Sequence, residues 1–203
     1  MNKQGSVIQA WGGHLVDLYR LMRFDVRNPH SYSKYRNIKA LQKRTGAKVF
    51  VETGTFLGNT AYRCSKIFEK VVTVELDKTL YEKARGYLAC RGNVECICGD
   101  ALKELPGILA RADVKESLIF LDGHFSGGKT ALGDMPEPAC EEIKVLAEYR
   151  EKISGVVVDD FREFGADNGW PHRWELLREI EASLGKEFDY TVHLDQVIVW
   201  RKK

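Results

Sequence analysis

Short apolar runs alternate with stretches of helical periodicity from residue 47 to the end of the chain. The runs predict strands at 47–53, 71–75, 93–98, 117–122, 155–160, 188–193 and 196–200. Between the earlier strands, apolar residues recur at spacings of three and four, which is typical of helices with one buried face. One such helix starts after Asp77, a residue that often caps helices, and another is predicted to turn Ile143, Leu146 and Ile153 inward. This alternation predicts an α/β fold, a parallel sheet with helices on both faces.

The two closing strands are too close together for a helical crossover, so we expect them to form an antiparallel hairpin. Residues 1–45 differ from the rest. Apolar residues such as Val7, Leu15 and Met22 predict an amphipathic helix over 6–23, and a basic helix follows over roughly 33–45. We expect 1–45 to be a helical appendage that packs on the sheet domain, 46–203, or forms a lid. Core packing is favoured over a membrane-surface helix.

Composition narrows the class of protein. A hydrophobic fraction of 44% and a charged fraction of 30% exclude a disordered chain, a fibrous one and a disulfide scaffold. No apolar run approaches the roughly 18–20 residues that span a bilayer, and no secretory signal is visible, so we expect a cytoplasmic protein. The five cysteines lack metal-ligand spacing, and Cys96 and Cys98 are expected to be small core residues.

The net charge of +2 hides an asymmetry, because residues 1–45 carry nine basic and two acidic residues, a balance of +7. Basic segments favour phosphate, nucleic acid, acidic substrates or membrane surfaces. A solvated helix face explains the same charge equally well.

Candidate binding residues follow the predicted strands, where parallel α/β sheets bind their ligands. The first strand leads into ETGTFLGNT, in which Gly54 and Gly58 allow close backbone approach to a ligand. Glu75 ends the second strand and can accept hydrogen bonds from both hydroxyls of a ribose. Asp100, after the third, can accept from an adenine amine or simply cap a helix.

These motifs, with LDGH after the fourth strand and the closing hairpin, resemble the class I S-adenosylmethionine-dependent methyltransferases over residues 49 to 200. The resemblance implies a Rossmann-like, seven-stranded, mostly parallel sheet of order 3-2-1-4-5-7-6. It also implies S-adenosylmethionine as cofactor. The cofactor-binding residues that it implies are Glu52, Gly54, Thr55, Gly58, Thr60, Glu75, Asp100 and Ala101.

Acidic residues and a histidine follow the fourth and fifth strands. Asp122 and His124 come after the fourth, and Asp159 and Asp160 end the fifth. Neighbouring strands lie about 4.8 Å apart, so these side chains should converge. A hydroxyl acceptor must lose its proton, for which His124 is a suitable base, and carboxylates suit Mg²⁺ or a similar cation. Strand-end aspartates that cap loops are the alternative. If the strand continues through them, Asp159 and Asp160 point to opposite faces.

The arrangement resembles the metal-dependent O-methyltransferases that act on sugars of antibiotics and polysaccharides. That resemblance implies a cation at Asp122, Asp159 and Asp160, with His124 where the family usually has an aspartate base; Asp122 and His124 are the expected catalytic residues. The expected reaction transfers a methyl group from S-adenosylmethionine to a hydroxyl of a small molecule or glycan. A homodimer is compatible with this interpretation.

Three other interpretations stay open. The segment GHFSGGKT satisfies the P-loop pattern, but Gly133, Pro136 and Pro138 interrupt it before the next helix. The basic segment suggests a nucleic-acid methyltransferase, yet LDGH stands where enzymes that methylate exocyclic amines carry Asn/Asp-Pro-Pro-Tyr/Phe. A non-catalytic nucleotide-binding module is the third, and the grouping of acidic residues argues against it.

Overall fold

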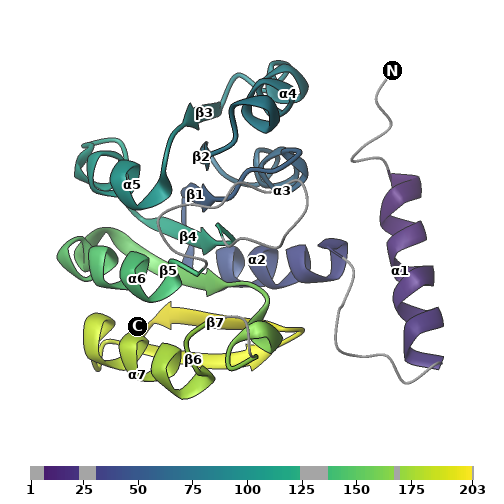
Figure 1. Ribbon diagram of the computed structural model, residues 1–203. Coiled ribbons are helices and arrows are strands. Elements are labelled where there is room, and N and C mark those ends of the chain that lie inside the picture. Colours follow the sequence, from purple (N-terminus) through teal and green to yellow (C-terminus); the bar gives the residue numbers. More distant parts are fainter. Residues whose placement is uncertain (1–6, 23–30, 124–136, 167–169, 203) are drawn as a thin grey trace.

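The computed structural model describes residues 7–22, 31–123, 137–166 and 170–202. A sheet of order β3-β2-β1-β4-β5-β7-β6 forms its centre, as the sequence predicts (Figure 1). The strands are β1 (Val49–Thr53), β2 (Lys70–Glu75), β3 (Val94–Cys98), β4 (Ser117–Leu121), β5 (Ile153–Val158), β6 (Phe188–His193) and β7 (Gln196–Arg201). The first five strands pair in parallel, and β7 pairs antiparallel to both β5 and β6.

Helices cover both faces of the sheet. On one face lie α2 (Ser31–Thr45), α3 (Asn59–Cys64) and α4 (Lys78–Leu88), and the other face carries α5 (Ala101–Ala110), α6 (Ala139–Glu148) and α7 (Arg173–Leu184). Strands β1 and β4 are buried along their whole length because they lie between these two layers. Phe50 and Phe120 pack on the α2 side, and Val51 and Ile119 on the α6 side, as the alternation of a strand requires.

The first helix, α1 (Val7–Met22), forms where the periodicity predicts it, and the large apolar side chains described on it, from Leu15 to Met22, are exposed. Leu15 is 63% exposed and Met22 is 69% exposed, so the expected core packing of this helix is wrong in the described structure. In Figure 1, α1 stands beside the sheet layers and covers neither face. Helix α2 packs across β5 and β7 instead, with Ile38 and Leu41 buried, and α1 contacts α2. The division at residue 45 stays a prediction.

Three smaller expectations need correction. The fifth strand runs over 153–158 and not 155–160, because Asp160 adopts a left-handed backbone (φ 51°) that no strand accommodates. Ile153 starts that strand, since α6 ends at Glu148 and a 3₁₀ turn over Arg150–Lys152 follows it. Cys98 is exposed, because β3 is an edge strand.

No helix in the described ranges is both long and apolar enough to cross a membrane. The five cysteines are all free thiols. The cytoplasmic location stays a prediction.

Candidate functional site

The glycine-rich turn after β1 brings two neighbouring strands into direct backbone contact. Gly54 has φ 84°, and a Cβ atom built on it would lie 2.2 Å from the carbonyl oxygen of Asp122, just beyond β4. Only glycine avoids this contact. Gly58 (φ 76°) precedes α3, where Thr60 lies in the first turn. The turn therefore lies at the carboxyl edge of the sheet, as the sequence predicts.

Three buried polar side chains, Glu52, Thr73 and Thr55, are connected by hydrogen bonds next to this turn. Thr73 Oγ1 donates to Glu52 Oε2 at 2.6 Å and lies 2.6 Å from Thr55 Oγ1. Burial raises the pKa of Glu52 to about 8, and the charge of Glu75 adds to the effect although the bond from Thr73 opposes it. Glu52 is therefore mainly a neutral acid at pH 7. It supports the turn from beneath, with 1% of its surface exposed.

The carboxylate of Glu75 is held in one orientation at the end of β2. Its Oε2 accepts from the backbone N–H of Phe56 at 2.7 Å, and its Oε1 accepts from that of Asp77 at 2.9 Å. Phe56 presents its N–H from a left-handed conformation (φ 51°). Each carboxylate oxygen keeps a further lone pair, so Glu75 is suited to accept two more hydrogen bonds from a bidentate donor such as a ribose.

Asp100 has the capping role that the sequence allows. Its side chain accepts from Leu102 N at 3.1 Å, and Ala101 begins α5. Lys103 Nζ lies 3.0 Å from its other oxygen. The cap orients the carboxylate on the same edge as Glu75, because Glu75 pairs with Cys98, two residues before Asp100.

Strand-end aspartates gather farther along this edge. Leu121 pairs with Val158, so Asp122 and Asp159 follow neighbouring positions of β4 and β5. The left-handed conformation of Asp160 turns the chain after β5, and Asp160 N donates to Asp159 Oδ1 at 2.9 Å. Both carboxylates therefore lie on the same side and contact the ammonium of Lys34, and the expectation of opposite faces does not apply. Burial raises the pKa of Asp122 well above its usual range, and the charges of Asp159 and Asp160 reinforce this.

Comparison with known proteins rests on structure. No family model and no curated protein matches the chain. An O-methyltransferase from Bacillus cereus, solved with S-adenosylhomocysteine, aligns with TM-score 0.62 and 16% identity over 84% of this chain and 81% of that one. TomG from Streptomyces achromogenes, an O-methyltransferase of tomaymycin synthesis solved with S-adenosylmethionine, aligns with TM-score 0.59 and 19% identity over 85% and 81%. The chain therefore shares the Rossmann-like fold of these methyltransferases.

This methyltransferase fold also serves other chemistry. The cyclase SpnF aligns with TM-score 0.52 and 18% identity over 81% of this chain and 60% of that one. The reaction therefore has to be argued from side chains and not from the fold. The fold nevertheless confirms the predicted strand order and hairpin.

The structure describes the positions of most predicted site residues but not of all. Those proposed for the cofactor lie along the edge of β1, β2 and β3, and Asp122, Asp159 and Asp160 lie beyond β4 and β5. Their roles stay predictions. His124 lies outside the described residues, as does the P-loop-like segment after it.

Sequence reasoning missed Glu142, which α6 places against the ends of β1 and β4. Glu142 is 1% exposed, and its carboxyl lies beside the hydroxyl of Thr53 and beside Gly123. Burial raises its pKa to about 8, with the charge of Glu137 adding to the effect. A signal was available, because Glu142 shares the inward stripe of α6 with Leu146 at a spacing of four.

Glu142→Gln is expected to stabilise the protein, and more so at pH 8 than at pH 5. The folded-state pKa of about 8 exceeds the ordinary 4.5, so wild-type stability falls as pH rises through this window. An amide does not ionise, which gives a gain on the order of 3 kcal/mol at pH 8. Thermal unfolding across pH measures it.

Glu141→Gln is the matched control, since that side chain is 44% exposed and pairs with Lys144 on the surface. Its effect should stay within about 1 kcal/mol at both pH values. An equal change for the two variants at pH 8 would show that Glu142 is not a buried, neutral acid.

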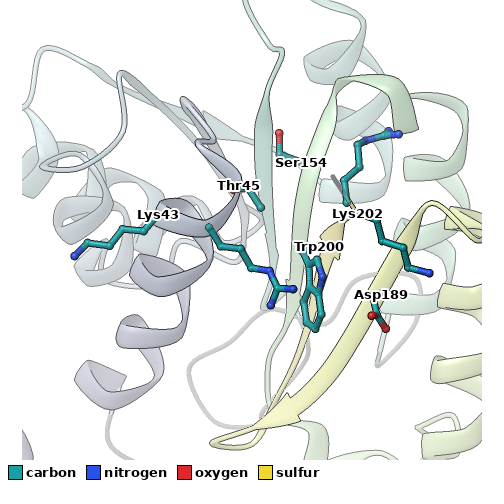
Figure 2. Close-up of a pocket in the computed structure, with 8 residues that line it drawn as sticks. Lys43, Thr45, Ser154, Asp189, Trp200 and Lys202 are labelled. Atoms are coloured by element: carbon teal, nitrogen blue, oxygen red, sulfur yellow. The ribbon is translucent and has the colours of Figure 1, made fainter.

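A basic pocket lies at the opposite edge of the sheet. Arg44 at the end of α2 stacks over Trp200, its guanidinium carbon 3.7 Å from the ring centre. Figure 2 shows the residues around this cavity of about 660 Å³, namely Lys43, Arg44, Thr45, Ser154, Asp189, Trp200, Arg201 and Lys202. Ser154 lies near the start of β5, whereas Asp159 follows its end. The pocket is therefore separate from the candidate cofactor edge.

Proposed function

We propose that this protein is an enzyme that transfers a methyl group from S-adenosylmethionine to a hydroxyl of a small molecule or glycan. The orientation of Glu75 carries the cofactor assignment. Two backbone N–H groups fix its carboxylate at the end of β2, where the remaining lone pairs suit the two ribose hydroxyls. The close contact of Gly54 with the backbone of Asp122 brings the turn after β1 against the end of β4, and the position of Asp100 and Ala101 at the start of α5 supports a role for them beside the adenine.

The cofactor supplies an electrophilic methyl group on a sulfonium. The chain must bind the acceptor in line with it and take up the hydroxyl proton as the carbon–oxygen bond forms and the carbon–sulfur bond breaks. We assign the proton to His124. Burial raises the pKa of Asp122 well above its usual range, and we assign this side chain to positioning and hydrogen bonding.

The residues described at the candidate cation site do not fit an open site for Mg²⁺. Lys34 contacts both Asp159 and Asp160, and Arg162 also contacts Asp160. No group of three or more His, Cys, Asp or Glu side chains in the described ranges is arranged to hold a metal ion. No step of the proposed reaction is therefore routed through a metal.

The nucleic-acid alternative gains no support from the basic pocket. Lys43 and Arg44 contribute to it at the amino edge of the sheet, away from Glu75 and Asp122. A base bound there would not reach a methyl group at the carboxyl edge.

A homodimer stays a prediction.

Glu75→Gln is expected to weaken binding of S-adenosylhomocysteine by about 10–100-fold, because a charge-assisted hydrogen bond contributes about 1.5–3 kcal/mol. Isothermal titration measures the affinity, with S-adenosylmethionine, NAD and ATP as further ligands. Binding of S-adenosylhomocysteine and S-adenosylmethionine, without binding of NAD or ATP, supports the proposal.

Glu82→Gln on α4 is the control, because that side chain is 49% exposed and pairs with Arg85. It should leave the affinity unchanged. Binding of NAD or ATP in preference to S-adenosylmethionine would overturn the cofactor assignment. Thermal unfolding of both variants checks that the Phe56 turn stays folded.

A further inference from the structure

Helix α2 places a lysine among the aspartates that follow β5. Lys34 Nζ lies 2.8 Å from Asp159 Oδ1, contacts Asp160 Oδ1 directly, and lies 3.8 Å from Asp195 Oδ2. Its side chain is 11% exposed. An ammonium has three donors and no acceptor, so it can donate to Asp159 and Asp160 together, while Asp195 lies too far for a hydrogen bond and adds only its charge. Burial works to lower the pKa of Lys34, but the charges of Asp159 and Asp160 outweigh it and raise the pKa, so the ammonium stays charged.

A guanidinium completes the cluster from the other side. Arg162 Nη1 lies 2.7 Å from Asp160 Oδ1 and also contacts Asp195 Oδ2. The backbone N–H of Arg162 donates to Asp195 Oδ1 at 2.8 Å. Asp195 reaches this place because the turn between β6 and β7 has two left-handed residues, Leu194 and Asp195, as tight hairpins require. Three segments of the chain, namely α2, the turn after β5 and the turn between β6 and β7, therefore meet at one group of charges.

This cluster differs from a cation site in its charge balance. Mg²⁺ needs nearly octahedral oxygen ligands at about 2.1 Å and is bound through carboxylate oxygens with free lone pairs. Here Asp159 and Asp160 already have a buried ammonium between them, and Asp160 has a guanidinium as well. A divalent ion would have to displace Lys34 or lie against it at strong repulsion.

We infer that the ammonium of Lys34 takes the place of a divalent cation at the carboxylates of Asp159 and Asp160, so that the enzyme works without a metal. Lys34 is a positioning residue in this arrangement. It orients the two carboxylates beside Asp122 and fixes the basic helix α2 at the catalytic edge. That the protein is a catalyst rests on the proposed methyl transfer. The position of Lys34 between Asp159 and Asp160 does not depend on that proposal.

Metal binding by the wild-type protein is the direct test. Mn²⁺ is titrated into the metal-free protein and followed by electron paramagnetic resonance. No binding should be seen up to about 1 mM Mn²⁺, because a built cation site would fill below that concentration and only weak surface sites fill above it. Mg²⁺ and Mn²⁺ should leave the melting temperature unchanged, and EDTA should leave methyl transfer unchanged. Submillimolar Mn²⁺ binding at this cluster, or loss of turnover with EDTA that Mg²⁺ restores, would overturn the inference.

Lys34→Ala tests the converse. Removing the ammonium takes away the positive charge between Asp159 and Asp160, and only Asp160 keeps its contact with Arg162. The melting temperature should therefore fall, and the variant should bind Mn²⁺ at least about tenfold more tightly than the wild type. Mn²⁺ should then raise its melting temperature. A folded Lys34→Ala protein with no gain in Mn²⁺ affinity would count against the inference.

Lys39→Ala provides the matched control, because Lys39 lies on the same helix and is exposed. It should behave as the wild type does in every measurement. If Lys34→Ala does not fold, the wild-type titration decides the question without it. Failure to bind S-adenosylhomocysteine would overturn the proposed function alone, since metal binding is measured separately.

Discussion

Replacing His124 by alanine is expected to slow methyl transfer by about 10²–10⁴-fold, the usual contribution of a general base. A hydroxyl attacks poorly while it keeps its proton, and alanine cannot accept one. The affinity for S-adenosylmethionine should change by less than about twofold, because the base acts on the acceptor and not on the cofactor. Transfer of a labelled methyl group to a panel of catechols and glycosides, with isothermal titration of the cofactor, measures both.

The dependence of the rate on pH gives a second readout for His124. A general base acts only in its unprotonated form, so the wild-type rate should rise with pH and then level off. The alanine variant should lose this rise. Ser126→Ala, two residues farther along the chain, is the control and should keep both the rate and its pH profile. Normal turnover by His124→Ala would remove the base assignment.

Gly54→Ala is expected to disrupt both the fold and the cofactor site. The new methyl group would lie 2.2 Å from the carbonyl oxygen of Asp122 and 2.7 Å from its carbonyl carbon. Because both atoms belong to the backbone, no side-chain rotation relieves the contact. The left-handed conformation (φ 84°) adds strain. Together these effects should cost about 2–6 kcal/mol, a large part of the stability of an ordinary domain.

Thermal unfolding and titration with S-adenosylhomocysteine measure the two consequences of Gly54→Ala. Gly86→Ala is the control, since Gly86 lies within α4 and a Cβ atom there meets nothing within 4 Å. That change should stabilise the protein by about 0.5–1 kcal/mol, because alanine favours helix over glycine. If Gly54→Ala unfolds and binds as the wild type does, β1 and β4 do not approach each other as described.

Local chemistry explains which features could be predicted from the sequence. Asp77 accepts from Leu80 N at 2.7 Å and Asp100 caps α5, as residue type and position suggested. The strand order followed from the family resemblance and is confirmed. Glu75, whose role stays a prediction, could be proposed because it is an acid at the end of the strand that follows the glycine-rich turn. The turn at Phe56 that orients it could not, because that conformation depends on contacts between β1 and β2.

Charged residues on buried helix faces are where sequence reasoning failed. Lys34 is one of the nine basic residues of the segment 1–45, yet it shares the inward stripe of α2 with Ile38 and Leu41. The same spacing argument that predicts an apolar face could have marked Lys34 as buried, and with it the need for a partner. It could not have named Asp159, which is distant in sequence.

The sequence by itself determined which strands and helices follow one another along the chain, because periodicity, caps and turns act over a few residues. It also determined that acids stand at the ends of β2, β4 and β5. Tertiary structure alone decided what those acids contact. The nearly balanced total charge of +2 concealed that a lysine from the basic segment lies between Asp159 and Asp160. Coulomb attraction in a buried place acts between groups that only the completed fold brings within a few ångströms.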